Sequence, residues 1–227
     1  MRDWVAWHDA YDEAGSPLHR RLVVVQQLIL DALDEMRPGP IRVVSMCAGQ
    51  GRDVVGALAD HPRRADVTGR LVELDERNAA VARELIVAAG LDLEVTTDDA
   101  GMSDAYRGAV PADLVLVCGV FGNVVDDDIA FTIEQLPQLC AEHATVLWTR
   151  GREPADITPR IRQWFTAAGF GELAVVAPEN VTFVVGANRL LGTPSKLRRR
   201  VRFFEFLDEQ HPGSDPTYNK FRGTTSR

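Results

Sequence analysis

Cysteine is scarce in this sequence, and the three cysteines are far apart. Cys47, Cys118 and Cys140 form no CxxC pair, so the sequence predicts neither a disulfide framework nor a zinc cage. The five histidines are equally scattered. The acids at 126–128 open a predicted helix, where they interact favourably with the helix dipole, and we interpret them in this way rather than as a magnesium site. We therefore expect no metal ion.

Lysine is scarce as well, and the acids outnumber the basic residues. The chain has only two lysines and a formal net charge of −8. A nucleic-acid surface needs a surplus of Lys and Arg on one face, so we do not expect nucleic acid as a partner. The local exception is KLRRRVRFF at 196–204, where arginines partly alternate with Val201 and Phe203. This alternation favours an edge or antiparallel strand whose charged face lies in water.

Long apolar runs are absent. No run approaches the roughly 18 residues that a membrane helix requires. The first 13 residues mix acids with aromatics instead of following a basic segment with an apolar one, as a signal peptide would. We therefore expect a soluble, cytoplasmic protein with no membrane partner, as a monomer or a homodimer. Its 227 residues suffice for one large domain or for one domain with an appendage.

Two helical patterns come first along the chain. The second lies between the breakers GSP at 15–17 and RPGP at 37–40. We expect residues 1–40 to form a helical cover and residues 41–227 to form the main domain. The first pattern, over residues 3–13, puts four side chains on one helix face: Trp4, Trp7, His8 and Tyr11.

From residue 41 onward, short apolar runs alternate with amphipathic helical patterns. This alternation predicts an α/β protein with a Rossmann-like, doubly wound, mostly parallel sheet of about seven strands. The predicted strands are 41–46, 67–73, 93–97, 112–118, 144–149 and 172–177. The predicted helices are 52–61, 76–90, 126–143 with a break or kink at Pro137, and 158–170.

The last strand has two candidates. We expect it over RVRFFEFL at 200–207, paired antiparallel near residues 172–177. The alternative is NVTFVVGANRL at 180–190.

The stretch SMCAGQGRD at 45–53 places glycines between a predicted strand and a predicted helix. Such a turn lets the backbone approach a nucleotide closely. The third position of the dinucleotide fingerprint G-x-G-x-x-G falls on Val54, which weakens the case for NAD or FAD. Glu73 ends the second predicted strand 22 residues after Gly51, the spacing expected of an acid that binds ribose hydroxyls.

Several motifs in this order resemble the class I S-adenosylmethionine (SAM) dependent methyltransferases. They are VVSMCAGQG at 43–51, VELDERNAAVAREL at 72–85, TTDDA at 96–100 and ADLVLVCGVFGN at 112–123. The stretches WHDAYDE, CAGQGRD, CGVFGN and WTRGREPADITPRIRQWF further resemble a subgroup of methyltransferases from high-GC bacteria, a resemblance that names no substrate.

The resemblance implies SAM as cofactor and S-adenosyl-L-homocysteine as product. It implies that Glu73 binds the ribose and that Leu74 packs against adenine. Asp99 then accepts from the adenine amino group, and the Ala100 N–H contacts the ring. The remaining implied cofactor residues belong to the glycine turn and to the loop beside the sulfonium: Ser45, Cys47, Ala48, Gly49, Gly51, Cys118 and Gly119.

Two positions depart from the family pattern. Ser45 stands where the family has an acid, and Cys47 where it has its first glycine. A serine binds an amino group more weakly than an acid, so part of the recognition of the methionine end must come from elsewhere. We expect it from Tyr11 or from an acid in the N-terminal helices.

The acceptor site is expected at the carboxyl ends of the strands and under the N-terminal cover. We expect His8, Tyr11 and Arg150 to be catalytic, with His8 the best base, while His143 qualifies by position but fits a surface turn better. The motifs of base-amine, cytosine C5 and protein arginine methyltransferases are missing, which favours a small-molecule acceptor. The residues expected to bind it are Trp7, His8, Phe121, Asn123, Trp148 and Arg150.

Other functions stay open at this point. A protein of this fold can use SAM for a reaction other than methyl transfer, or sense SAM. An RNA methyltransferase and an NAD-dependent oxidoreductase are further alternatives.

Overall fold

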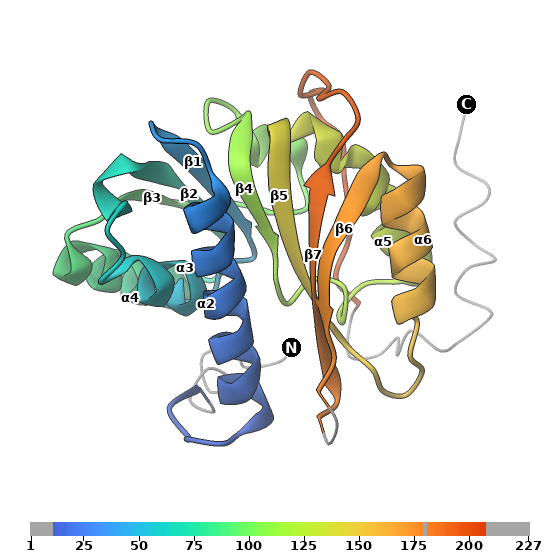
Figure 1. The fold of residues 1–227 in the computed structure, drawn as a ribbon, viewed down its shortest axis with the longest axis horizontal. Helices are drawn as coiled ribbons and strands as arrows, with labels where there is room; N and C mark the ends of the chain where they lie inside the picture. Colours follow the sequence, from blue (N-terminus) through green and yellow to red (C-terminus); the bar gives the residue numbers. More distant parts are fainter. Residues whose placement is uncertain (1–10, 179–180, 208–227) are drawn as a thin grey trace.

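The computed structural model of the protein describes residues 11–178 and 181–207. Most of the predicted first helix, with Trp7 and His8, lies outside these residues. Seven strands form one sheet in the order β3-β2-β1-β4-β5-β7-β6 (Figure 1). Their bounds are β1 Ile41–Met46, β2 Val67–Glu73, β3 Asp92–Thr97, β4 Ala112–Val117, β5 Cys140–Gly151, β6 Phe170–Val176 and β7 Phe183–Leu190.

The sheet is mostly parallel. Strands β1 to β5 run parallel to one another, and β7 lies antiparallel between β5 and β6. This is the predicted doubly wound, Rossmann-like architecture with an antiparallel last strand. The central strand β4 is buried along almost its whole length, as expected of a parallel strand covered on both faces.

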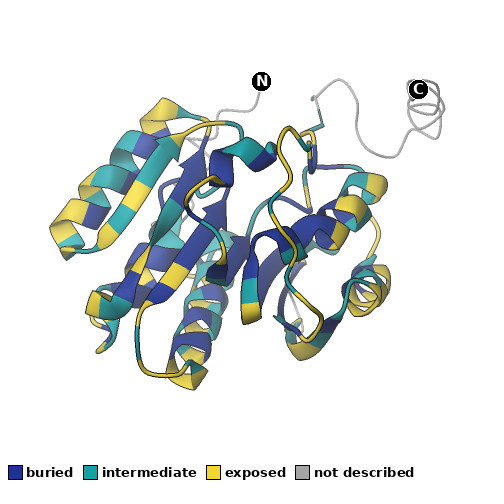
Figure 2. Ribbon diagram, turned by 90° about the horizontal axis from the view of Figure 1, so that it is seen from above, coloured by how far each residue is buried: buried dark blue, intermediate teal, exposed yellow. Residues whose placement is uncertain are grey.

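Helices cover both faces of the sheet. Helices α2, α3 and α4 pack on one face, where their apolar side chains join β1, β2 and β7. Helices α5 and α6 pack on the other face in a separate core cluster. Figure 2 shows the buried residues concentrated in the sheet and on the inward sides of the helices. The bounds are α2 Pro17–Glu35, α3 Arg52–Leu58, α4 Glu76–Ala89, α5 Asp126–Gln135 and α6 Thr158–Ala167.

Local capping explains where helices begin and end. Ser16 caps α2 by accepting a hydrogen bond from the His19 N–H, and Asp75 caps α4 by accepting one from the Arg77 N–H. Gly90 ends α4 in the left-handed conformation with φ 61°. At the other end of α2, the Arg63 guanidinium donates to four backbone carbonyl groups in and just after the last turn, those of Leu33, Met36, Arg37 and Gly39.

The predicted last strand over 200–207 is wrong, and the alternative segment forms β7. β7 is an inner strand that is buried almost throughout. Trp148 packs so closely on Gly186 of β7 that a Cβ there would lie 2.1 Å from its Cε2 atom, so only glycine fits this register. Residues 200–207 instead form an extended segment that makes one isolated bridge, between Met102 and Arg202.

The predicted helix over 126–143 is too long. Its α-helical part ends at Gln135, a 3₁₀ turn covers Leu136–Gln138, and β5 begins at Cys140. Proline lacks an N–H and clashes with the preceding turn of a helix, so the predicted break at Pro137 is confirmed and the residues after it join the sheet.

Among the described residues, no helix combines the length and the apolar character needed to cross a membrane.

Candidate functional site

A cavity of about 820 Å³ opens at the carboxyl ends of the parallel strands. These ends point toward the N-terminal end of α2 at the bottom of Figure 1. Ligands of open α/β sheets bind at this edge, and the volume lies within the roughly 300 to 1,000 Å³ typical of small-molecule and cofactor sites. The predicted site residues that line the cavity are Tyr11, Cys47, Ala48, Gly49, Glu73, Leu74, Asp99, Ala100, Cys118, Gly119, Asn123 and Arg150.

Four predicted site residues within 11–178 and 181–207 do not line the cavity, while Trp7 and His8 lie outside the described residues. Ser45 lies within β1, where its hydroxyl is buried without a hydrogen-bond partner among the described residues. Phe121 and Trp148 belong to the core on the α5 and α6 face. The Trp148 indole N–H donates to Asn188 Oδ1 at 2.8 Å, so its polar atom is already satisfied inside the protein. The fourth residue, Gly51, shapes the glycine turn.

The glycine turn is held in shape by its own backbone and by β2. Cys47, Gly49 and Gly51 have φ values of 50°, 56° and 69°, in the left-handed region that favours glycine. A Cβ on Gly51 would lie 2.8 Å from a methyl group of Leu71, so this glycine is also required by close packing. The Ala48 N–H donates to the Val72 carbonyl at 3.0 Å. The turn therefore places backbone groups at the cavity wall.

Glu73 is held in the cavity wall by two backbone N–H groups. One carboxylate oxygen accepts from the Gly49 N–H at 2.7 Å and the other from the Asp75 N–H at 2.9 Å. Burial raises the pKa of Glu73, and the hydrogen bonds from these two N–H groups oppose that rise. The carboxylate is thus fixed before any ligand arrives, and each oxygen keeps a free lone-pair direction.

Asp99 follows β3 and forms the second acidic point of the cavity. Its Oδ1 accepts from the Gly101 N–H at 2.8 Å, and its Oδ2 accepts from an Arg202 guanidinium nitrogen at 3.0 Å. Two apolar groups lie near these acids in the sequence: Leu74, which is 69% exposed, and Ala100, which is buried. We call this part of the cavity, made by the glycine turn, Glu73, Leu74, Asp99 and Ala100, the β2–β3 half.

The N-terminal parts of α2 and α3 bring a base and an acid to the cavity. Asp53 of α3 is half-buried, and burial raises its pKa while the nearby Arg21 of α2 lowers it. Arg21 donates to the Tyr11 hydroxyl at 3.0 Å. Burial also raises the pKa of Tyr11, so its hydroxyl stays protonated at neutral pH. The sequence analysis missed Asp53 and Arg21, although Asp53 directly follows the glycine turn.

The loops after β4 and β5 form the other part of the cavity, which we call the β4–β5 half. The Gly119 N–H donates to Thr149 Oγ1 at 2.9 Å, and the Asn123 amide donates to the Gly119 carbonyl at 2.7 Å. Arg150 stands near the end of β5, half-buried, and burial lowers its pKa. Cys118 also lines the cavity, and burial raises the pKa of its thiol, so it stays protonated at neutral pH.

The extended segment 200–207 closes one side of the cavity. Phe203 is buried, and its carbonyl accepts from Thr132 Oγ1 at 3.0 Å. This anchor holds Arg202, Phe204, Glu205 and Phe206 against the cavity. The sequence analysis placed a strand here, and so missed these four residues as part of the site.

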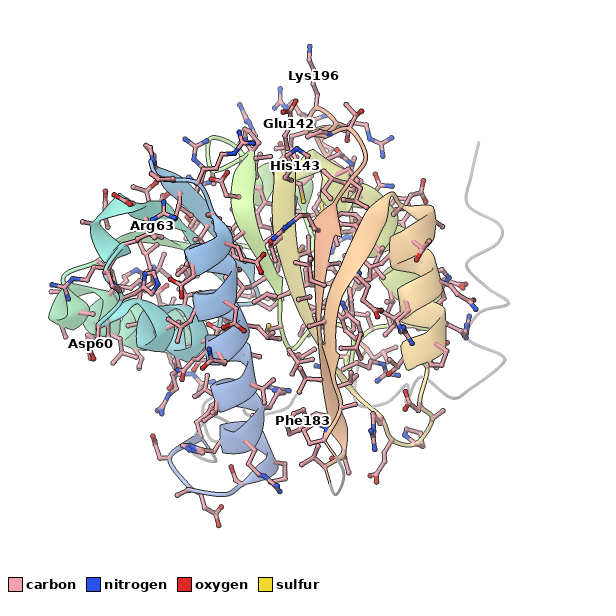
Figure 3. The ribbon with its side chains drawn as sticks, in the orientation of Figure 1. Asp60, Arg63, Glu142, His143, Phe183 and Lys196 are labelled. Carbon is pink, nitrogen blue, oxygen red and sulfur yellow. The ribbon has the colours of Figure 1, made fainter. Side chains whose placement is uncertain are left out.

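Two other sequence candidates do not line the cavity. His143 is exposed near the amino end of β5, beside Glu142 at the top of Figure 3, the edge opposite the cavity. Of the acids that open α5, Asp126 pairs with Arg160 and Asp128 accepts from the Glu205 N–H.

Comparison with family models found no match, and comparison with curated proteins found none either. Solved structures are similar to the chain. The carbon methyltransferase CurJ has a TM-score of 0.61 at 14% identity over 79% of this chain and 56% of that chain. Magnesium protoporphyrin IX methyltransferase (ChlM) from Synechocystis PCC 6803, with bound SAM, has a TM-score of 0.56 at 14% identity over 83% of this chain and 97% of that chain.

The [4+2]-cyclase SpnF is also similar, with a TM-score of 0.54 at 12% identity over 72% of this chain and 80% of that chain. This chain spans little more than half of the CurJ chain. At such identities a likeness shows the fold, and one fold hosts many reactions. The chain has the Rossmann-like fold of the class I SAM-dependent methyltransferases.

Proposed function

We propose that the protein is a SAM-dependent methyltransferase that acts on a small-molecule acceptor. The observation that carries the proposal is the β2–β3 half: a glycine turn, a fixed carboxylate after β2 and a second carboxylate after β3, all facing one cavity. This is the arrangement that an adenosine group requires, since its ribose offers two hydroxyl donors and its base offers an amino group and an apolar face.

The residues of the β2–β3 half fit the nucleoside part of SAM. Glu73 would accept from the ribose hydroxyls with its free lone pairs. The exposed Leu74 side chain offers an apolar surface to the purine ring, since an apolar side chain in contact with the cavity gains by being covered. Asp99 would accept from the adenine amino group, sharing its carboxylate with Arg202.

Asp53 and Arg21 fit the methionine end. This end carries an ammonium and a carboxylate, so it requires one acid and one base within reach of the glycine turn. Asp53 supplies the acid that the family has at the position of Ser45, and Arg21 supplies the base. The acid therefore comes from α3 and the base from α2, whereas we expected Tyr11 or an acid of the N-terminal helices.

The cofactor, when bound, supplies an electrophilic methyl group on its sulfonium sulfur. The remaining tasks of the protein are to orient the acceptor and to exclude water. Tyr11 and Arg150 face the cavity and are available for the first task. Because the Tyr11 hydroxyl stays protonated, we propose that it orients the acceptor by hydrogen bonding rather than as a base; the role of His8 as base remains a prediction.

Calorimetric titration with SAM, S-adenosylhomocysteine and NAD in parallel tests the cofactor. We expect micromolar binding of the first two and no signal with NAD. Binding of NAD alone would replace the proposal by hydride transfer. Release of S-adenosylhomocysteine with candidate acceptors then separates a methyltransferase from a SAM sensor or a cyclase-like enzyme, and salt-dependent RNA binding would favour an RNA substrate.

A further inference from the structure

Within the described part of the chain, five arginines line the cavity: Arg21, Arg52, Arg77, Arg150 and Arg202. Four of them have partners inside the protein: the Tyr11 hydroxyl for Arg21, Asp12 for Arg52, Asp75 for Arg77 and Asp99 for Arg202.

Arg150 differs from the other four. Its Nε atom is buried, and it has no hydrogen-bond partner within residues 11–178 and 181–207. The negative charges of Asp126 and Asp156 act on the pKa of Arg150 from a distance. Neither aspartate contacts Arg150 in the described part of the chain. A half-buried guanidinium without a partner is costly, because burial removes water without supplying an acceptor. A bound ligand that carries an acceptor would remove this cost.

There is open space around the Arg150 guanidinium. A Cβ added to Gly122 would lie no closer than 4.0 Å to any heavy atom, and the atom at that distance is an Arg150 terminal nitrogen. A Cβ added to Gly119 would meet nothing within 4 Å. The Asn123 amide, which could compete for a ligand, already donates to a backbone carbonyl. The guanidinium is therefore a charged group of the β4–β5 half that a ligand can reach.

Topology separates Arg150 from the nucleoside residues. Glu73 and Asp99 follow β2 and β3, on one side of β1, whereas Arg150 stands on β5, beyond β4. If the cofactor lies over the β2–β3 half, as in the proposed function on which this inference rests, Arg150 faces the acceptor.

We propose that Arg150 binds a carboxylate of the acceptor, so that the substrate is a small organic acid. The guanidinium fork matches the planar carboxylate with two parallel hydrogen bonds. A phosphate dianion fits less well, because the acids at 126–128 open α5 nearby and add negative charge. The stacked rings of Phe204 and Phe206, with centroids 5.7 Å apart, line the same cavity and favour an aromatic acid.

The test uses matched ligand pairs that differ only in charge. Benzoate and benzamide, phenylacetate and phenylacetamide, and indole-3-acetate and indole-3-acetamide are titrated into the full-length protein, with and without saturating S-adenosylhomocysteine, and followed by NMR. Phenyl phosphate tests the alternative anion. The proteins compared are wild type, Arg150→Gln, Arg150→Lys and Arg152→Gln. The last is a matched control, because Arg152 pairs with Asp156 and does not line the cavity.

We expect at least one acid to bind wild type and Arg152→Gln about tenfold or more tightly than its amide, the usual gain of a charge-assisted pair. Arg150→Gln should abolish this preference, and Arg150→Lys should keep part of it. Affinity for S-adenosylhomocysteine should stay within about twofold in Arg150→Gln.

Several results would overturn the inference: no binding of any acid to wild type, equal binding of acid and amide, tighter binding of phenyl phosphate, or a preference that survives in Arg150→Gln. A loss of S-adenosylhomocysteine binding in Arg150→Gln would also overturn it, since Arg150 would then hold the cofactor. If wild type does not bind S-adenosylhomocysteine but shows the Arg150-dependent preference, the proposed cofactor fails and the carboxylate site stands.

Discussion

The two halves of the cavity differ in how their charged groups are held. In the β2–β3 half, both carboxylates are fixed by hydrogen bonds from the protein before a ligand binds. In the β4–β5 half, glycines leave open space around a guanidinium whose Nε has no partner in the described chain. A half with preformed hydrogen bonds suits the cofactor, which is the same in every turnover. An open half with one unpaired guanidinium suits the acceptor, because that charge can decide which substrate binds. The predictions below test this contrast, from the largest expected effect to the smallest.

The first prediction concerns the substitution Phe203→Ala, because Phe203 anchors the segment 200–207 at one side of the cavity. Phe203 is 2% exposed and stacks on Tyr106 with ring centroids 6.1 Å apart, so its truncation should lower the free energy of unfolding by about 3 to 5 kcal/mol. Denaturant unfolding measures this loss. Phe131→Ala is the matched control, because Phe131 is 38% exposed, and its loss should be much smaller. Equal losses would show that the segment 200–207 is not held by Phe203.

Glu73→Ala should weaken SAM binding by roughly 1.5 to 3 kcal/mol, the usual loss for hydrogen bonds to a charged group. Calorimetry measures the change, with Glu84→Ala on the exposed face of α4 as control. Unchanged affinity in Glu73→Ala would move the ribose site elsewhere and remove the basis for the contrast between the halves.

Asp53→Asn should weaken SAM binding by about tenfold, because an amide binds an ammonium less strongly than a carboxylate does. It should also change stability with pH. Burial raises the pKa of Asp53 in the folded state, so ionised Asp53 costs stability at pH values above its folded pKa.

The variant should therefore be more stable relative to wild type at neutral pH than at pH values below the unfolded pKa, where both side chains are neutral. Urea unfolding of both proteins from pH 3 to pH 8 measures the difference. A difference that stays constant with pH would show that burial does not perturb this carboxyl.

Arg150→Gln and Arg202→Gln should change stability in opposite directions. The first removes an unmet charge and should leave the free energy of unfolding unchanged or raise it by up to about 1 kcal/mol. The second breaks the exposed pair with Asp99 and should lower it by roughly 0.2 to 1 kcal/mol. Thermal unfolding of both variants measures the changes. A clear loss of stability in Arg150→Gln would mean that Arg150 has a structural role.

Local signals made several elements predictable from sequence. The bounds of β2 and α4 follow from an apolar run, an Asp cap and a terminal glycine, all of which act within a few residues. The last strand was not predictable in this way, since both candidate segments contain the Val and Phe residues that are typical of strands. The close fit of Trp148 on Gly186 decides between them, and it joins residues that are far apart in the chain.

The residues of the candidate site were likewise predictable from the sequence only in part. Glu73 was found from its spacing after the glycine turn, and Asp99 from the resemblance of TTDDA to the family motif. Asp53 and Arg21 were missed because they face one cavity only after α2 and α3 have packed together. Phe121 and Trp148 were expected in the site, but the sequence does not say which loop and strand side chains turn into the α5 and α6 core.

The contact between residues 200–207 and the loop after β3 has a consequence for synthesis of the protein on the ribosome. Arg202 reaches back over about 100 residues to Asp99, and Phe203 donates its N–H to the Gly101 carbonyl. A nascent chain therefore has both acids of the β2–β3 half long before it has the segment that closes that half. Residue 202 is synthesised after the whole of β7, so a chain released before residue 202 lacks the guanidinium partner of Asp99.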